Sequence, residues 1–447
     1  MKGLRYFIEI GGKYFKGDYI MYRILKKSLA SFMTLLILIL TVFTVPVYAD
    51  DQPANPLTKD GYTLDFSDEF DGPELDKTKW TDYYLPHWTK NPENAKAQYR
   101  FENGSLIEYI TEDQKPWSPE HDGTVRSSAI MSFDKNWIHN FSGTTSNEDR
   151  EPWVGYATTY GYFEIRAKLA DCGGGGHQAW WMVGMQNDTD DWFNSKETGE
   201  IDIIESFFSK PDTWRIAAYG WNDPNFQTSW LLSEESVPSG EPTSEYHIYG
   251  LDWSPGSLKF YYDNELYKEI NQAPNYPMGT ILNIYTDAGS GQHNDVWPKE
   301  WAIDYFRVWK KNEGYETPLY HIKNRETGKY LYIDENNDKV LYGNIDEFDT
   351  NGVWEKEGAG DYIRLKNEKT QEYLHLENQT GFLEHGKVPQ TYYSAQWRVE
   401  NEENYLRFNN RWKNNQYIHM EDQMGVVQYG NVPKGYWSSQ WELIQVQ

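Results

Sequence analysis

Short runs of alternating apolar and polar residues recur throughout the sequence after residue 49. Gly, Pro, Asn and Asp bound these runs, and no apolar pattern of period 3.6 is sustained. Because successive side chains of a β-strand point to opposite faces, this pattern predicts half-buried strands. Residues 258–267 predict a hairpin that turns at Asp263-Asn264. We therefore expect an all-β protein.

Three carboxyl groups fall within six residues, Glu200-Ile201-Asp202-Ile203-Ile204-Glu205. On a regular strand Glu200 and Asp202 share one face and Glu205 lies on the other. Glu205 joins them only if a β-bulge absorbs one extra residue, and bulges are frequent beside active sites. Neighbouring carboxylates raise one another's pKa, so an acid and an ionised carboxylate can coexist near neutral pH, as retaining glycoside hydrolysis requires. The alternative is a solvated acidic edge strand.

Five motifs follow one another in the chain around this strand: Phe66-Ser67-Asp68-Glu69-Phe70-Asp71-Gly72, Tyr160-Gly161-Tyr162-Phe163-Glu164-Ile165-Arg166, Gly199 to Glu205, Tyr249-Gly250-Leu251-Asp252-Trp253 and Ile303-Asp304-Tyr305-Phe306-Arg307-Val308. In this order they resemble glycoside hydrolase family 16. The resemblance implies that residues 57–311 form a jelly-roll β-sandwich with an open, endo-acting cleft. It also implies Glu200 as nucleophile, Glu205 as general acid/base and Asp202 as the residue that orders and tunes the pair.

Aromatic and polar residues near the acidic strand are candidates for binding substrate, because sugar faces stack on rings and hydroxyls need polar partners. Burial in the sandwich core is the alternative for each tryptophan. His177 is also a candidate because it follows the glycine run at 173–176. The candidates are His177, Trp180, Trp181, Trp192, Trp221, Asn222 and Trp230.

We expect catalysis without a cofactor. The resemblance implies one structural calcium ligand, Asp304, although a lone Asp lacks the six to eight oxygens that calcium prefers. Cys172 is the only cysteine, so no internal disulfide can form, and a packing role is expected for it.

Residues 1–49 are expected to be a secretion signal. Basic residues precede an apolar run over residues 35–45, and Val47-Tyr48-Ala49 offers a small-residue cleavage site. Met21 is an alternative start. A membrane anchor is the alternative interpretation, which the short run and Pro46 disfavour. The basic residues are Arg23, Lys26 and Lys27.

A formal net charge of −26 opposes binding to nucleic acid or to an anionic membrane. Loss of the basic signal would make the remaining chain more acidic still. A neutral polysaccharide carries no such repulsion. We therefore expect a secreted monomer with a polysaccharide partner, and neither nucleic acid nor, after signal cleavage, membrane.

From residue 318 to residue 447 the chain repeats itself three times. Each unit begins with a tyrosine, turns at a glycine and closes on a tryptophan at Trp354, Trp397 or Trp441. This period of about 43 residues without a helix resembles a ricin-B-like β-trefoil, which implies carbohydrate binding. The alternative is a trefoil that only packs on the catalytic domain. The expected boundary is the polar segment at 313–318.

Together these features predict a secreted, retaining endo-β-glycosidase that hydrolyses a β-1,3-glucan or a β-galactan or other galactose-containing glycan by double displacement. Gln178-Ala179-Trp180 and Ser206-Phe207-Phe208 depart from the motifs of laminarin-cutting relatives, which moves weight towards galactosides and leaves the two substrate classes near parity. A transglycosylase using the same intermediate is one alternative. A non-catalytic secreted lectin is another, which the intact set of carboxyl groups disfavours.

Overall fold

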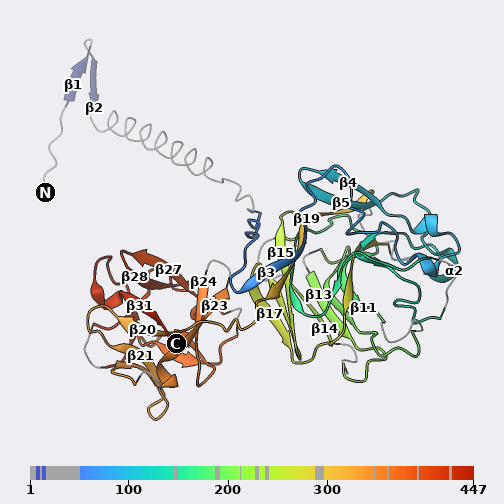
Figure 1. Cartoon of the computed structure of the whole chain (residues 1–447). Helices are drawn as coiled ribbons and strands as arrows, with labels where there is room; N and C mark the ends of the chain where they lie inside the picture. The colour runs from blue at the N-terminus through green and yellow to red at the C-terminus, as the bar shows by residue number, and fades with distance from the viewer. Residues whose placement is uncertain are drawn as a thin grey trace. The chain divides into compact units, whose positions relative to one another are not determined.

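The computed structural model describes residues 7–10, 13–16, 51–143, 150–186, 192–211, 213–226, 231–236, 241–286, 296–346, 349–359, 362–389, 392–421 and 425–446. The chain divides into two units, residues 1–50 and residues 51–447, and Figure 1 labels the described strands of the first and many of those of the second. In the first, strand β1 (Phe7–Ile10) pairs antiparallel with β2 (Lys13–Lys16). The basic and apolar segments of the predicted secretion signal lie outside the described residues. Among the described residues, no helix has the length and apolar character needed to cross a membrane.

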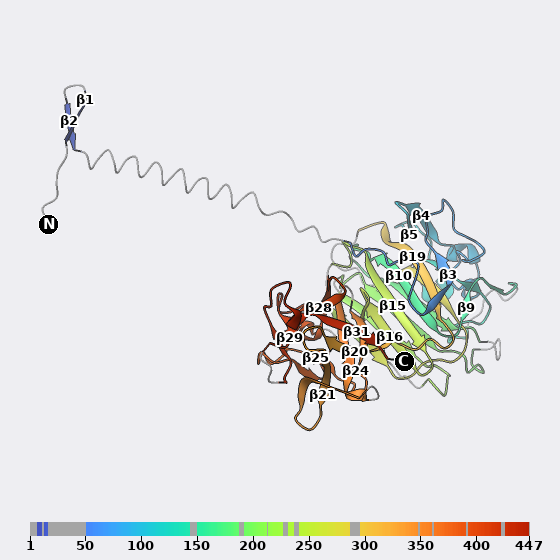
Figure 2. The same ribbon diagram turned by 60° about the vertical axis from the view of Figure 1, so that its left-hand side comes forward.

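One face of the sandwich is an eight-stranded antiparallel sheet. Its strands are β3 (Tyr62–Asp68), β4 (Gln98–Glu102), β5 (Ser105–Ile110), β10 (Gly161–Lys168), β15 (His247–Ser254), β16 (Ser257–Tyr262), β17 (Glu265–Ile270) and β19 (Lys299–Lys311). Their order is β17-β16-β15-β10-β19-β5-β4, with β3 also paired to β19, and Figure 2 shows β15, β10 and β19 side by side. The predicted hairpin is confirmed, because β16 and β17 are joined by Asp263 and Asn264 with φ of 50° and 66°.

The second sheet carries the acidic strand. Its strands are β6 (Ser127–Met131), β9 (Ala157–Thr158), β11 (His177–Gly184), β12 (Glu200–Phe207), β13 (Thr213–Tyr219), β14 (Leu231–Ser236) and β18 (Met278–Tyr285). Their order is β14-β13-β12-β11-β18-β6, with β9 paired to β18. A small separate pair consists of β7 (Phe133–Asp134) and β8 (Trp153–Val154).

Two apolar clusters pack against the second sheet. The main core includes residues from both sheets, such as Phe163, Trp180, Ile201 and Trp253. A smaller cluster lies on the other face of the second sheet, where Ala179, Trp181 and Ile281 contact residues of the segment 84–138. This segment contains the short helices η1 (Pro86–Trp88), η2 (Pro92–Ala95) and α2 (Pro119–Asp122). It therefore forms a wall beside the outer face of β11 and β12.

The C-terminal region consists of one four-strand unit repeated three times. The strands of the first unit are β20 (Leu319–Asn324), β21 (Tyr330–Asp334), β22 (Lys339–Gly343) and β23 (Val353–Ala359), with η3 (Thr350–Gly352) before the last strand. The second has β24 (Tyr362–Asn367), β25 (Tyr373–His375), β26 (Glu384–Gly386), η4 (Tyr393–Ala395) and β27 (Trp397–Glu402). The third has β28 (Tyr405–Asn410), β29 (Tyr417–His419), β30 (Gln428–Gly430), η5 (Trp437–Ser439) and β31 (Trp441–Gln445).

The closing tryptophan of each unit is fully buried and occupies the same place. The Nε1 atoms of Trp354, Trp397 and Trp441 donate to backbone carbonyls that lie 23 residues earlier in the chain, at 3.0, 3.2 and 3.0 Å. These tryptophans belong to an apolar core separate from that of the sandwich. The expectation of an all-β chain is confirmed, and the assignment of residues 318–447 to a β-trefoil stays a prediction that this repeat supports.

Candidate active site

Strand β12 contains the predicted bulge. Its pairing with β13 shifts register between Asp202 and Glu205, and its pairing with β11 shifts between Trp180 and Trp181. Ile203 is the extra residue. Its side chain is buried in the core, and its carbonyl accepts a hydrogen bond from the indole of Trp214 at 2.7 Å. Because the bulge changes the alternation of side chains, Glu200, Asp202 and Glu205 all face one cavity.

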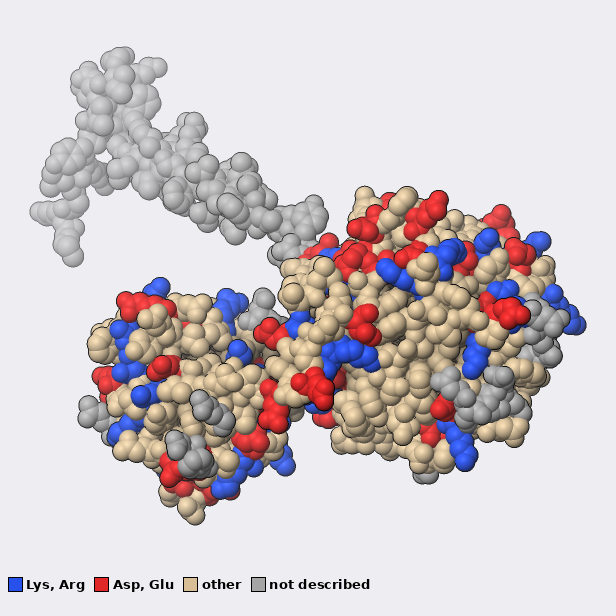
Figure 3. Space-filling model, in the orientation of Figure 1, with Lys and Arg blue, Asp and Glu red and all other residues tan. Residues whose placement is uncertain are grey.

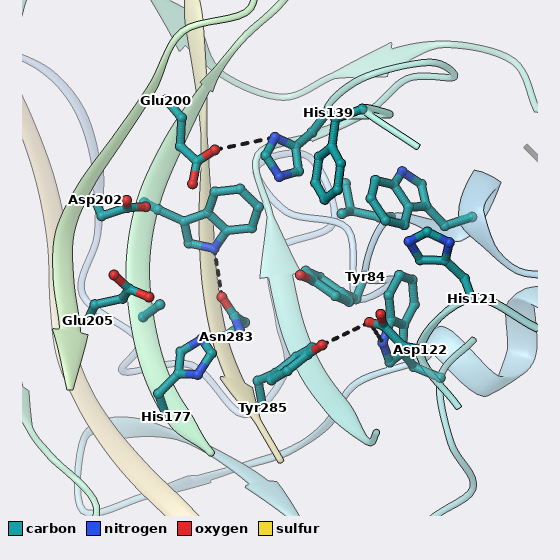
Figure 4. Close-up of a pocket in the computed structure, with 16 residues that line it drawn as sticks. Tyr84, His121, Asp122, His139, His177, Glu200, Asp202, Glu205, Asn283 and Tyr285 are labelled. Atoms are coloured by element: carbon teal, nitrogen blue, oxygen red, sulfur yellow. Dashed lines mark hydrogen bonds and ion pairs between the residues drawn. The ribbon is translucent and has the colours of Figure 1, made fainter. Parts of the chain in front are cut away.

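This cavity has a volume of about 240 Å³ and lies on the outer face of the second sheet (Figure 4). The three carboxyl groups stand along one side, and the aromatic residues of segment 84–141 stand opposite. The lining residues are Tyr84, Leu85, Trp88, Trp117, His121, Asp122, His139, Phe141, His177, Ala179, Trp181, Glu200, Asp202, Glu205, Asn283 and Tyr285.

Glu200 has two ring nitrogens near one of its oxygens. Trp221 Nε1 donates to Glu200 Oε2 at 2.7 Å, and His139 Nδ1 lies 3.6 Å from the same oxygen. Burial raises the pKa of Glu200 to about 7, and the charge of Glu205 adds to the rise. The Trp221 hydrogen bond opposes the rise, because it stabilises the ionised carboxylate. Glu200 can therefore change its charge near neutral pH.

Asp202 lies between the two glutamates and is the group most disfavoured as an anion. Burial, followed by the charges of Glu200 and Glu205, raises its pKa well above the usual range. It also shares a hydrogen bond with Glu200 that lowers the pKa of Glu200 and raises that of Asp202. The carboxyl proton of the pair therefore resides on Asp202, which donates to Glu200.

Glu205 is held by a cation from the neighbouring strand. Arg215 lies directly opposite Glu205 in the β12–β13 register. Its Nε donates to Glu205 Oε2 at 2.7 Å, and a second guanidinium nitrogen contacts Oε1. The guanidinium also lies 4.6 Å from the ring of Phe207. This two-point pairing fixes the orientation of the Glu205 carboxylate.

His139 is a neutral imidazole at the Glu200 end of the cavity. Burial lowers its pKa to about 3. Its ring lies within 4.9–6.2 Å of five aromatic rings, those of Trp88, Phe141, Trp181, Trp192 and Trp221. A sugar bound beside Glu200 would therefore meet an apolar aromatic wall and one uncharged imidazole.

Comparison with known proteins agrees with this geometry. A family model for glycosyl hydrolases family 16 matches residues 122–307, which include all three carboxyl groups. A solved structure, the GlcNAcα1-4Gal releasing endo-β-galactosidase from Clostridium perfringens, is 71% identical and covers 89% of this chain and 100% of its own, with a TM-score of 0.60. The chain belongs to glycosyl hydrolases family 16.

Two curated relatives are more distant. Glucan endo-1,3-beta-glucosidase A1 of Niallia circulans is 27% identical over 284 residues, which are 56% of this chain and 38% of that protein. Glucan endo-1,3-beta-glucosidase of Cryptopygus antarcticus is 27% identical over 243 residues, 51% of this chain and 75% of that protein. The chain therefore spans well under half the length of the first of these family 16 relatives.

Two of the predicted substrate residues line the cavity of this family 16 glycoside hydrolase. Both residues belong to β11: Trp181 lines the cavity, and so does His177, which is labelled in Figure 4. The indole of Trp181 donates to Asn283 Oδ1 at 2.7 Å, which fixes the ring. Trp180 has the opposite parity on the same strand and is 0% exposed in the main core. Trp180 therefore does not line the cavity.

The other predicted substrate residues surround the Glu200 end. Trp221 is 41% exposed and donates to Glu200. Trp192 is buried against it, with ring centroids 6.0 Å apart. The side-chain amide of Asn222 donates to the backbone carbonyl of Trp192 at 2.8 Å and so holds the backbone of Trp192 in place. Trp230 lies outside the described residues.

The far wall of the cavity was not predicted from sequence. Asp122 accepts hydrogen bonds from Trp117 Nε1 at 2.9 Å and from the Tyr285 hydroxyl at 2.8 Å. Trp88 Nε1 makes no hydrogen bond to any residue that the structure describes. A high density of aromatic residues between 80 and 141 was the available signal, but sequence does not show that this segment folds over β11.

Asp304 supplies a single carboxylate, and Arg166 pairs with it at 2.8 Å. Among the described residues, no group of three or more His, Cys, Asp or Glu side chains is arranged to hold a metal ion. Calcium at Asp304 stays a prediction, which a melting temperature lowered by a chelator would support.

Proposed function

We propose that the protein is a secreted, retaining endo-β-galactosidase that cuts β-galactosidic bonds within galactose-containing glycans. The observation that carries the proposal is the 71% identity, over 89% of the chain, to an endo-β-galactosidase that releases GlcNAcα1-4Gal. At the site itself, three carboxyl groups on a bulged strand face an aromatic-walled cavity. The acidic and basic side chains are interspersed on the face shown in Figure 3, which suits a neutral polymer.

In the proposed reaction Glu200 is the nucleophile. Its carboxylate attacks the anomeric carbon while Glu205 gives a proton to the leaving oxygen and the glycosidic bond breaks. Water then attacks the glycosyl-enzyme, Glu205 takes a proton from that water, and Glu200 is released. Two inversions at one carbon leave its configuration retained. Hydrogen bonds from Trp221 and Asp202 keep Glu200 ionised for the first step.

The test is a substrate panel combined with carboxamide variants. The unsubstituted chain should release oligosaccharides from galactose-containing glycans with retained anomeric configuration, seen by NMR during early turnover. Glu200→Gln and Glu205→Gln should each lose at least about 10⁴-fold in kcat. Glu300→Gln is the matched control, since Glu300 pairs with Arg100 and does not line the cavity. Normal turnover by Glu200→Gln would refute the assignment.

The same panel separates the alternatives. Cleavage of laminarin in preference to galactosides would favour β-1,3-glucan, the substrate class in the names of the two curated relatives. Products that are longer than the starting oligosaccharide would favour transglycosylation. Glycan binding without release of any reducing end would favour a non-catalytic lectin.

We also propose that residues 318–447 bind glycan and so hold the enzyme on its substrate. Large aromatic side chains stand exposed on this region, including Tyr392, Trp412, Tyr436 and Trp437. Exposed rings of this kind offer stacking surfaces for sugars. Weak sites on one polymer-bound region can together raise the local substrate concentration. Secretion through residues 1–49 and a monomeric state complete the proposal.

A further inference from the structure

The three hairpins of the C-terminal region meet side by side. They are β21–β22, β25–β26 and β29–β30, one from each unit. The amide of Leu383 donates to the carbonyl of Val427 at 2.9 Å, and the amide of Val427 donates to the carbonyl of Val340 at 3.1 Å. Because backbone hydrogen bonds join the hairpins, any hollow between them is present before a ligand binds.

In two of the three units a tyrosine fills the space between neighbouring hairpins. The Tyr342 hydroxyl accepts a hydrogen bond from the amide of Gly425 at 3.2 Å. The Tyr429 hydroxyl accepts one from the amide of Gly381, also at 3.2 Å. Each tyrosine directly precedes the glycine that ends its hairpin, and the residue at this position in the second unit is His385.

His385 does not reach the next hairpin as the tyrosines do. Its side chain is 8% exposed, and its Nδ1 donates to Glu372 Oε2 at 2.7 Å. Nε2 makes no hydrogen bond to any described residue, and the carboxylate of Asp338 on the next hairpin lies 3.5 Å from it. A buried ring nitrogen that makes no hydrogen bond is costly unless a ligand or water supplies one.

The space beside His385 is a cavity of about 470 Å³, within the usual size range of small-ligand sites. Its walls come from the turn of the first unit, at Asp338 and Lys339, and from Asn378, Thr380 and Phe382 of the second unit. Phe382 is 37% exposed. The cavity therefore combines one aromatic surface with several hydrogen-bonding groups.

We propose that this cavity binds one pyranose ring of a neutral glycan, with Phe382 against the apolar face of the sugar and His385 Nε2 bonded to a hydroxyl. A pyranose needs this combination, one apolar face and several donors and acceptors around its edge. Asp338 and Glu384 outnumber Lys339 in the lining, so an anionic sugar is disfavoured. The assignment rests on the proposal that residues 318–447 bind glycan, and it does not require a particular catalytic specificity.

The other two units suggest a test, because in each of them a tyrosine fills the space that is open beside His385 in the second unit. His385→Tyr restores the residue of units one and three and should fill the space while adding the hydrogen bond that they make. We would titrate galactose, N-acetylglucosamine and glucose by calorimetry into the full chain carrying Glu200→Gln, with and without His385→Tyr. The two chains differ only at residue 385, so a difference in their sugar affinity comes from this cavity and not from the active site. His385→Tyr should weaken binding of at least one sugar about tenfold or more, with an equal or higher melting temperature.

A second variant keeps the test independent of His385. Phe382→Val introduces the residue found at the same place in the third unit, Val426. It should weaken the binding of the same sugar to a similar degree. Lys434→Gln changes an exposed side chain of the same region that pairs with Glu402 and does not line the cavity, and it should leave that binding unchanged.

Titrations that are the same with and without His385→Tyr for all three sugars would overturn the proposal. Hydrolysis of a short soluble galactoside is measured separately in chains that keep Glu200. If that hydrolysis is absent while binding still depends on His385, the proposed activity fails and the cavity assignment stands.

Discussion

Arg215 holds both oxygens of Glu205 from the strand next to it, with one N–O distance of 2.7 Å. This pairing orients the Glu205 carboxylate, which acts as base in the second step of the proposed reaction. In the first step Glu205 must carry a proton. Arg215 therefore influences the orientation of Glu205 in both steps of the proposed reaction.

Arg215→Gln removes the two-point pairing that orients the Glu205 carboxylate. Loss of orientation should lower kcat about tenfold. Arg215→Lys keeps the charge without the two-point geometry, so it should also lower kcat. An unchanged kcat in Arg215→Gln, measured on a short soluble oligosaccharide, would show that Arg215 has only a packing role.

Trp221→Phe tests the hydrogen bond to Glu200. The indole stabilises the ionised nucleophile, so its removal should raise the pKa of Glu200 above about 7 and move the acidic limb of kcat/KM to higher pH. The loss in kcat/KM should be about 10- to 100-fold, as expected for a hydrogen bond to a charged group. Phe141→Leu is the control. Phe141 stacks on Trp221 at 5.5 Å, and its replacement leaves the indole N–H in place.

The bulge was predictable because it follows from the alternation of side chains within six residues. Two apolar residues separate Asp202 from Glu205, so without a bulge Glu205 would lie on the face of the strand opposite Glu200 and Asp202. Trp180 and Trp181 are adjacent, and alternation implies that only one can face the cavity, but which one depends on the β11–β12 register. Arg215, Trp88 and Tyr285 lie on different elements, and only the strand pairing and the fold of segment 84–141 bring them near the carboxyl groups of β12. Long-range placement of this kind is not encoded in local patterns.

Glu200 should make stability depend on pH. Its pKa is about 7 in the folded protein and near 4.5 when exposed, so the folded state binds the proton more tightly. The contribution of this group is fully present below pH 4.5 and is lost as the pH rises through 7. Glu200→Gln removes the buried charge and should therefore raise the melting temperature more at pH 8 than at pH 5. Equal shifts at both values, measured by calorimetry, would mean that Glu200 titrates normally.

Truncation tests what the C-terminal region contributes. Strand β19 ends at Lys311, and β20 begins at Leu319. Within the connection, the ring of Tyr315 packs on Gly61, where an added Cβ would lie 2.2 Å from it. A chain ending at residue 316 keeps this contact, and one ending at Lys311 loses it. The two cores are separate, so both truncated chains should fold, with the longer one melting higher.

Turnover of short soluble oligosaccharides should stay within a few-fold after truncation at residue 316, because the carboxyl groups and the cavity lie between residues 84 and 285. Activity on dilute or insoluble glycan should fall much more, since the binding region no longer raises the local substrate concentration. Equal losses on both substrates would identify residues 318–447 as a folding partner. Sedimentation of the isolated fragment 317–447 with glycan provides the complementary measurement, and His385→Tyr in that fragment should reduce the amount that sediments.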